Sequence, residues 1–133
     1  MKRKRNCAVI ILYNNKKEIL LQHRDKNAPR LPNYWALFGG GIDKGESIEE
    51  AIHRETLEEL NYQLKNPELI MEEKFIGQQN HGIKYVFKEK YNSKKKLTLL
   101  EGQGMAWYTI DQALKLKIVD HDKEVLKYIK DKL

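Results

Sequence analysis

The segment from Gly39 to Asn61 constrains the fold more than any other part of the chain. Three consecutive glycines follow a short apolar run, and a polar loop then leads to Ser47. Ser47 and Glu50 have the spacing of a capping box, which predicts that a helix begins after Ser47. Asn tolerates the left-handed conformation that closes helices, so this helix is expected to end near Leu60 and Asn61. The segment therefore predicts a strand whose backbone other groups can approach closely, followed by a short polar loop and a helix.

One face of this predicted helix changes character along its length. At about 100° per residue, Ile48, Ala51 and Ile52 begin an apolar stripe, and the next three positions on that stripe are glutamates. These glutamates are Glu55, Glu58 and Glu59. They repel one another at spacings of three and four residues. Mg²⁺ is a natural counter-charge because it prefers carboxylate oxygens and shares its coordination sphere with substrate phosphates. Taken alone, the helix slightly favours a solvated acidic face over a metal site.

Apolar and alternating runs elsewhere predict a mixed α/β domain. The expected strands are 7–13, 18–24, 35–38, 68–77, 82–91 and 105–109. The first two form a hairpin through Asn14-Asn15-Lys16, and a turn at 79–81 joins the fourth to the fifth. A short helix is expected at 111–116 and an amphipathic one at 121–133.

Length and composition limit the class of protein. The 133 residues are enough for one globular domain, expected over 1–133, and too few for two. The formal charge of +6 favours anionic partners such as nucleotides. A single cysteine, Cys7, excludes an intrachain disulfide and favours a reducing, cytoplasmic setting. No run approaches the roughly 18 apolar residues of a membrane span, so no membrane association is expected.

The glycine loop and the helix together match a longer pattern. Gly40 is followed after five residues by Glu46 and after seven more by Arg54-Glu55-Thr56-Leu57-Glu58-Glu59. This pattern resembles the signature of the Nudix hydrolases, whose glycine, glutamate, Arg-Glu and Glu-Glu positions all match in register. The chain departs from the signature at packing or helix-closing positions and keeps the carboxylates. The departures are Thr56 and Tyr62 in place of aliphatic residues and Asn61 in place of glycine.

The resemblance implies an α/β/α sandwich around a mixed β-sheet, and hydrolysis of a pyrophosphate bond in a nucleoside diphosphate linked to another group. Mg²⁺ is the expected cofactor and Mn²⁺ the alternative. The implied metal ligands are Gly40, through its carbonyl, and Glu55, Glu58, Glu59 and Glu101. The implied catalytic residues are Glu46, Arg54, Glu55 and Glu58. Among these, Glu55 is either a ligand or the base, and Glu46 orients the loop and helix. Arg54 pairs with a neighbouring carboxylate, although helical periodicity places it to one side of the glutamates.

Substrate choice depends on residues outside the signature. Arg24 and Asp122 resemble positions that contact the nucleotide in the MutT-like branch, and both are candidate substrate-binding residues. The alternatives are a plain strand-end arginine and, for Asp120 and Asp122, capping of the last helix. We expect a nucleoside triphosphate substrate, with oxidised dGTP as one form, that yields the monophosphate and pyrophosphate.

Three further substrate classes fit the same chemistry: nucleotide sugars, dinucleoside polyphosphates and capped RNA. A non-catalytic nucleotide- or RNA-binding module is the alternative of another class, suggested by the basic N-terminus and by Lys94-Lys95-Lys96. The intact carboxylates argue against it, so a small-molecule nucleotide is preferred over nucleic acid as partner. The sequence leaves a monomer and a homodimer equally open.

Overall fold

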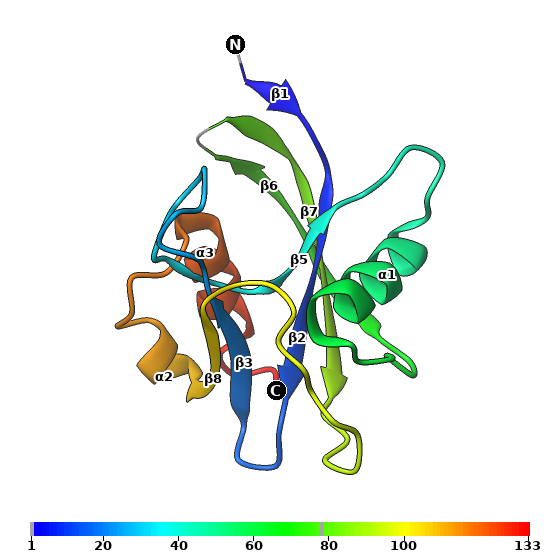
Figure 1. Ribbon diagram of the computed structural model, residues 1–133, viewed down its shortest axis with the longest axis vertical. Helices are drawn as coiled ribbons and strands as arrows, with labels where there is room; N and C mark the ends of the chain where they lie inside the picture. Colours follow the sequence, from blue (N-terminus) through cyan, green and yellow to red (C-terminus); the bar gives the residue numbers. More distant parts are fainter. Residues whose placement is uncertain (1, 78) are drawn as a thin grey trace.

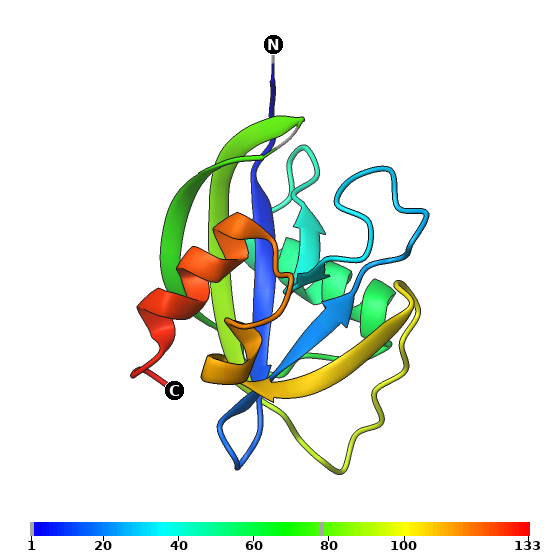
Figure 2. The same ribbon diagram turned by 90° about the vertical axis from the view of Figure 1, so that its left-hand side faces the viewer.

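The elements of the chain form three layers, with a mixed sheet between helices (Figure 1). The computed structural model describes residues 2–77 and 79–133. The strands are β1 (Arg3–Lys4), β2 (Cys7–Tyr13), β3 (Glu18–His23), β4 (Trp35–Ala36), β5 (Phe38–Gly41), β6 (Glu68–Ile76), β7 (Asn80–Lys90) and β8 (Gly104–Thr109). The helices are α1 (Ile48–Leu60), α2 (Ile110–Ala113) and α3 (Asp120–Ile129). Helix α1 lies on one side of the sheet, and α2 and α3 lie on the other, as the two views show (Figures 1 and 2).

Strand β2 is the centre of the sheet and explains why the sheet is mixed. It runs parallel to β7 over its whole length, from Cys7 opposite Lys84 to Tyr13 opposite Lys90. Its first half pairs antiparallel with β5, and its last residue, Tyr13, pairs antiparallel with Ile19 of β3. Strand β3 carries β8 and β4, while β6 pairs with the other side of β7. The glycines of β5 are thereby fixed beside β2 and next to α1.

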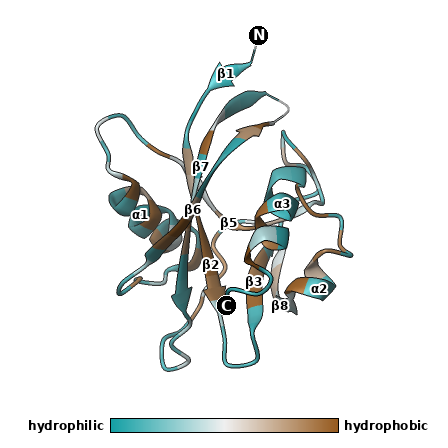
Figure 3. Cartoon of the chain, turned by 180° about the vertical axis from the view of Figure 1, so that it is seen from behind, coloured by the Kyte–Doolittle hydropathy of each residue, from teal (hydrophilic) through white to brown (hydrophobic). Residues whose placement is uncertain are grey.

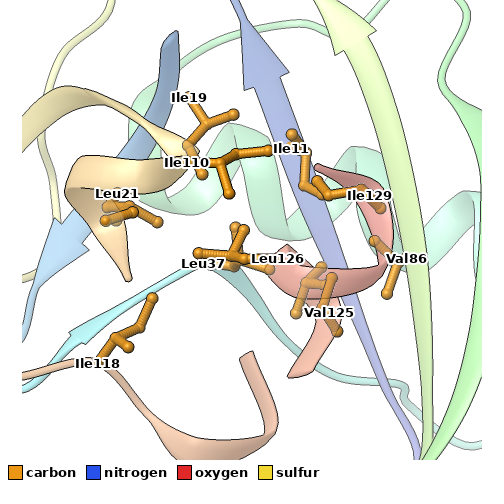
Figure 4. Close-up of a cluster of buried hydrophobic side chains, with 12 residues drawn as sticks. Ile11, Ile19, Leu21, Leu37, Val86, Ile110, Ile118, Val125, Leu126 and Ile129 are labelled. Atoms are coloured by element: carbon orange, nitrogen blue, oxygen red, sulfur yellow. The ribbon is translucent and has the colours of Figure 1, made fainter. Parts of the chain in front are cut away.

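Alternation along β2 divides the hydrophobic core into two clusters. Val9 and Ile11 pack in one cluster with residues of α3. Ala8, Ile10 and Leu12 pack in the other cluster with residues of α1. Figure 4 shows the first cluster, in which side chains from β2, β3, β7 and α2 surround the apolar face of α3. Hydrophobic residues are concentrated on the central strands, and the outer faces of the helices are hydrophilic (Figure 3). This two-sided burial confirms the α/β/α sandwich.

Helix α1 begins and ends as predicted. Ser47 and Glu50 form both hydrogen bonds of the capping box, and Asn61 closes the helix with φ 50° and ψ 38°. The other two departures from the Nudix signature, Thr56 and Tyr62, are buried, and the hydroxyl group of each forms a hydrogen bond. The hydroxyl of Thr56 donates to the carbonyl of Ile52, and the hydroxyl oxygen of Tyr62 accepts from a backbone N–H.

Several expected boundaries were wrong. The expected strand 35–38 is two strands, and β5 includes the glycines because they pair with β2. Strand β7 begins at Asn80, inside the expected turn, because the two-residue strand β1 pairs with its start. Helix α2 begins one residue early because Thr109 and Gln112 form a capping box, and it ends at Ala113. Helix α3 ends at Ile129, although Leu133 still packs against the core.

Within the described residues, no helix combines the length and apolar character needed to cross a membrane.

Candidate active site

Two glutamates of α1, Glu55 and Glu59, face the glycines of β5. A Cβ atom added to Gly40 would lie 2.6 Å from Oε1 of Glu55, so only glycine leaves room for this carboxylate. Oε1 of Glu59 accepts a hydrogen bond of 2.8 Å from the backbone N–H of Gly39. The side chain of Glu59 is buried, whereas that of Glu58 is 57% exposed. The predicted acidic stripe thus runs from a buried carboxylate against the sheet to an exposed one at its edge.

Arg54 joins the loop that carries Glu46 to the glutamates of helix α1. Its guanidinium donates to both carboxylate oxygens of Glu46 at 2.7 and 2.9 Å, and to the carbonyl of Gly41 at 3.0 Å. It also donates to Glu55 at 2.9 Å and to Glu58 at 3.1 Å. The expectation that Arg54 lies to one side of the glutamates was therefore wrong. Helical periodicity places its Cα to one side, but its long side chain reaches between the carboxylates.

Glu46 is the partner that aligns Arg54. Hydrogen bonds from Arg54 and from the backbone of Asp43 lower the pKa of Glu46 to about 2. Glu46 therefore carries its charge throughout the neutral range, and its bidentate contact fixes the plane of the guanidinium. This geometry is the one expected of a residue that orients the loop against the helix.

The pKa values of the inner carboxylates show that negative charge is crowded there. Burial is the main cause that raises the pKa of Glu59 to about 9, and Glu55 and Glu101 raise it further. Burial also raises the pKa of Glu55, against the opposing effect of Arg54. Glu101, from the loop before β8, is thus close enough to act on both side chains. A divalent cation would relieve this repulsion, and the available donors are all oxygen atoms, as Mg²⁺ prefers.

The donor set fits a divalent ion in its chemistry, although its side chains are not gathered around one point. Within residues 2–77 and 79–133, no three His, Cys, Asp or Glu side chains are arranged to hold a metal ion. The guanidinium of Arg54 lies between Glu55 and Glu58 and binds both. Because the Glu58 side chain is exposed, it can turn toward Glu55 and Glu59 at little packing cost. Ligation by these residues stays a prediction.

A pocket of about 180 Å³ lies beside the carboxylates and shares the glycines of β5 with them. This volume is below the roughly 300–1,000 Å³ of pockets that enclose a drug-sized ligand, so the pocket can enclose only a part of such a ligand. Its charged lining is mainly cationic, because it contains Arg5, Arg24, Arg30 and Lys84 and one carboxylate, that of Asp122. The guanidinium of Arg5 lies so close to Gly41 that a Cβ atom there would overlap it.

Both predicted substrate-binding residues line this pocket, but each already has partners. Arg24 donates to the carbonyls of Arg30 and Leu31 at 2.8 and 3.3 Å and so holds the loop after β3. Asp122 accepts from the backbone N–H of Leu37 at 3.0 Å and from the ammonium of Lys84. The alternative that Asp120 or Asp122 is the N-cap of α3 was wrong, because the N-cap is Val119 and no side chain caps the helix, although both acids lie in its first turn as expected. Asp122 instead ties α3 to the break between β4 and β5.

Lys84 and His121 are pocket residues that the sequence reasoning missed. Lys84 has a side-chain exposure of 2%, and its ammonium contacts Nδ1 of His121 as well as Asp122. Burial, followed by the charge of Lys84, lowers the pKa of His121 to about 4, so this ring is neutral at pH 7. One signal was available: Lys84 lies two residues before Val86, on the same face of an alternating strand, where an apolar residue is expected.

The profile of the NUDIX domain matches residues 2–129, almost the whole chain. The chain belongs to the NUDIX family. The crystal structure of a MutT protein from Methanosarcina mazei Go1 superposes with a TM-score of 0.85 at 21% identity, covering 96% of this chain and 93% of that one. A MutT NUDIX hydrolase from Burkholderia pseudomallei gives a TM-score of 0.81 at 24% identity, with 95% and 98% covered. At these identities the two structures establish the NUDIX fold.

A curated relative matches the chain over a shorter segment. The nucleoside triphosphatase NudI of Salmonella agona is 42% identical over 62 residues, which are 47% of this chain and 43% of NudI. The match therefore spans less than half of that relative's length.

Proposed function

We propose that this NUDIX protein is a Mg²⁺-dependent hydrolase that cleaves a pyrophosphate bond of a nucleoside triphosphate and releases the monophosphate and pyrophosphate. One observation carries the proposal: the crowded carboxylates of α1 contact Gly39 and Gly40 of β5, and the cationic pocket is lined by these two glycines and Gly41. A metal site and an anion-binding pocket with a common wall suit a substrate that joins a polyphosphate to a nucleoside. The name of the matched relative NudI supports a triphosphate over the other candidate classes.

The metal, when bound, neutralises phosphate charge and lowers the pKa of the attacking water. Glu55, Glu58 and Glu59 would hold it, with Glu101 and the carbonyl of Gly40 as further oxygen ligands. Mn²⁺ fits the same donors. Because the carboxylates are adjacent and coupled, their titration belongs to the group rather than to one residue.

The chain's own groups supply positioning and proton transfer. Glu55 is half-buried against Gly40 with a raised pKa, which suits a residue that accepts the proton of the attacking water. Arg54 is held by Glu46 and contacts Glu55, so the pair would keep that carboxylate in place. Arg5 and Arg24 line the pocket beside the glycines and would contact the phosphates.

The test is product release from a panel of substrates, with and without Mg²⁺. The panel holds dNTPs, oxidised dGTP, nucleotide sugars, dinucleoside polyphosphates and capped RNA. For the triphosphates, the products are identified as monophosphate with pyrophosphate or as diphosphate with phosphate. Glu58→Gln is measured beside Glu49→Gln, an exposed first-turn glutamate of the same helix.

We expect Mg²⁺-dependent release of pyrophosphate from a nucleoside triphosphate, lost in Glu58→Gln and kept in Glu49→Gln. Preference for another member of the panel would retain the chemistry and replace the substrate. An absence of turnover on every member, together with RNA binding that weakens steeply with salt, would favour the binding module instead.

A further inference from the structure

Gln22, near the end of β3, is a buried polar side chain beside the apolar core. It is 4% exposed, and alternation along the strand places it on the same face as Leu20, which packs in the cluster shared with α1. A buried amide costs free energy unless it finds a hydrogen-bond partner. Its partner is distant in the sequence: Nε2 of Gln22 donates to the backbone carbonyl of Glu101 at 3.0 Å. Because a carbonyl only accepts, the amide must present its nitrogen there.

The turn that carries Glu101 packs directly against the end of β3. The backbone N–H of Gln103 donates to the carbonyl of His23 at 2.9 Å. Gly102 has φ 102°, and a Cβ atom added to it would lie 2.9 Å from that same carbonyl and 3.0 Å from Cγ of Gln22. The turn is therefore fixed on β3 by backbone contacts on one side of Glu101 and by the amide of Gln22 at Glu101 itself.

The chain just before this turn is fastened to α1, so the segment crosses from α1 to β3 (Figure 1). The N–H of Leu100 donates to the carbonyl of Glu59 at 2.8 Å. The carboxyl group of Glu101 is close enough to that of Glu59 for the two to share a hydrogen bond, which is among the causes of the raised pKa of Glu59. Glu101 thus lies between an anchor on α1 and an anchor on β3, with its carboxyl group at the inner glutamates.

Glu101 needs such anchors because its own side chain is exposed. Glu59 is fixed by burial and by the N–H of Gly39, whereas an exposed glutamate on a loop must be ordered each time it binds an ion. The backbone of Glu101 is the part of this residue that the fold can hold. A functional carboxylate on a loop gains precision when a buried partner fixes the backbone that carries it.

We propose that Gln22 is a positioning residue that, by binding the backbone carbonyl of Glu101, holds the Glu101 carboxylate at the inner glutamates of α1 and so completes the metal site. This inference rests on the metal site of the proposed function and adds to it a residue outside the Nudix signature. Gln22 contacts neither the metal nor the substrate and acts through Glu101 alone.

The first measurement is the affinity for Mn²⁺ without nucleotide, followed by the electron paramagnetic resonance signal of the free ion. Gln22→Met keeps the length of the side chain and removes the donor. We expect Mn²⁺ binding to weaken by roughly 10-fold, the lower end of losses from outer partners of metal ligands. The matched control is Gln63→Met, which replaces an exposed glutamine that donates to the carbonyl of Leu64 and should leave the affinity unchanged.

A double-mutant cycle with Glu101→Gln separates positioning from a general loosening of the fold. If Gln22 acts through Glu101, its loss has no further effect once the carboxylate is gone. We expect Gln22→Met to lower both the Mn²⁺ affinity and the Mg²⁺-dependent kcat of the wild type, and to lower neither in the Glu101→Gln background. A melting temperature for each variant checks that it is folded.

A second variant displaces the same carboxylate without altering the buried amide, in case Gln22→Met does not fold. In Gly102→Ala the new Cβ would meet the carbonyl of His23 at 2.9 Å, at a positive φ, so the turn must shift away from β3. We expect weaker Mn²⁺ binding in Gly102→Ala as well, and no such loss when Glu101→Gln is already present.

The outcomes separate this inference from the proposed function. Wild-type Mn²⁺ affinity in Gln22→Met, or an equal loss in both backgrounds, would overturn the inference and leave the proposed function intact. An unchanged affinity in Glu101→Gln would do the same, because Glu101 would then lie outside the metal site. Mn²⁺ binding that follows the cycle, without turnover of any nucleoside triphosphate, would support the positioning role and overturn the proposed function. No Mn²⁺ binding by the wild type would overturn both.

Discussion

Gly40 is a position where one methyl group decides the geometry of the site. The Cβ of Gly40→Ala would lie 2.6 Å from a Glu55 carboxylate oxygen, and the flexible carboxylate rather than the backbone would shift. We expect the variant to fold and to lose turnover by about 100-fold, as misplacements of about 1 Å do. The matched control is Gly104→Ala, whose added Cβ would meet only His23 at 3.9 Å. Steady-state rates at saturating Mg²⁺ and a melting temperature check both, and a fully active Gly40→Ala would contradict the role of Glu55.

The residues of the site differ in how far the sequence could reveal them. Glu55 and Glu59 follow from helical spacing, because both lie on a single helix that has clear caps. The position of the Arg54 guanidinium does not follow from helical spacing. It depends on hydrogen bonds to Glu46, in the loop before α1, and on the length of the arginine side chain. Lys84 and His121 meet only through the packing of β7 against α3, which local spacing does not contain.

Helix α1 presents the carboxylates to β5, and the capping box at its N-terminus helps to hold it in place. Ser47→Ala removes the side-chain acceptor for the N–H of Glu50 and should cost about 1 kcal/mol of unfolding free energy. For a chain of this size, that corresponds to a fall in melting temperature on the order of 3–4 °C. Ser93→Ala, in the exposed loop after β7, should change the unfolding free energy by less than about 0.5 kcal/mol. Equal melting temperatures for the two variants would show that the cap does not hold the helix.

The ends of an element were predictable where contacts within that element specify them. They were less predictable where contacts with distant parts of the chain specify them. The capping box and Asn61 gave both ends of α1 because these contacts lie within the helix itself. The division between β4 and β5 was not predictable, because it follows from Asp122 binding the N–H of Leu37, 85 residues away. Strand β1 likewise owes its conformation to pairing with the start of β7.

The stability of the whole molecule should depend on pH through His121. Its pKa is about 4 in the folded protein, against an ordinary value of 6.5. The unfolded chain therefore takes up a proton first, and His121 lowers stability as pH falls from 6.5 toward 4. Its contribution is on the order of 2 kcal/mol, less than the full shift implies because the ring is partly solvated.

Glu59 changes the stability with pH in the opposite direction to His121. The effect of His121 must therefore be measured as a difference between the wild type and a His121 variant. Its pKa is raised from 4.5 to about 9, and it lowers stability as pH rises through that interval. Urea unfolding of the wild type and of His121→Phe at several pH values isolates the histidine. We expect the stability of the wild type relative to the variant to decline between pH 6.5 and 4. A constant difference would mean that His121 titrates normally in the folded protein.

At the scale of the molecule, the sequence pattern predicted the layers better than their connections. The α/β/α sandwich followed from the Nudix resemblance, and the strand order did not follow from the order of the elements. Strand β2 pairs with β7, the paired residues being 77 positions apart, and only long-range packing selects that partner. The same packing creates the pocket, which draws its lining from both ends of the chain.

The central claim is that the glutamates of α1 hold the metal on which hydrolysis depends. The most direct measurement is the Mg²⁺ dependence of pyrophosphate release from a nucleoside triphosphate for the wild type, Glu59→Gln and Glu49→Gln. We expect the wild type and Glu49→Gln to saturate alike, and Glu59→Gln to lose at least about 100-fold, the upper end of losses from outer partners of metal ligands. Turnover of Glu59→Gln within about twofold of the wild type, at every Mg²⁺ concentration, would contradict the claim.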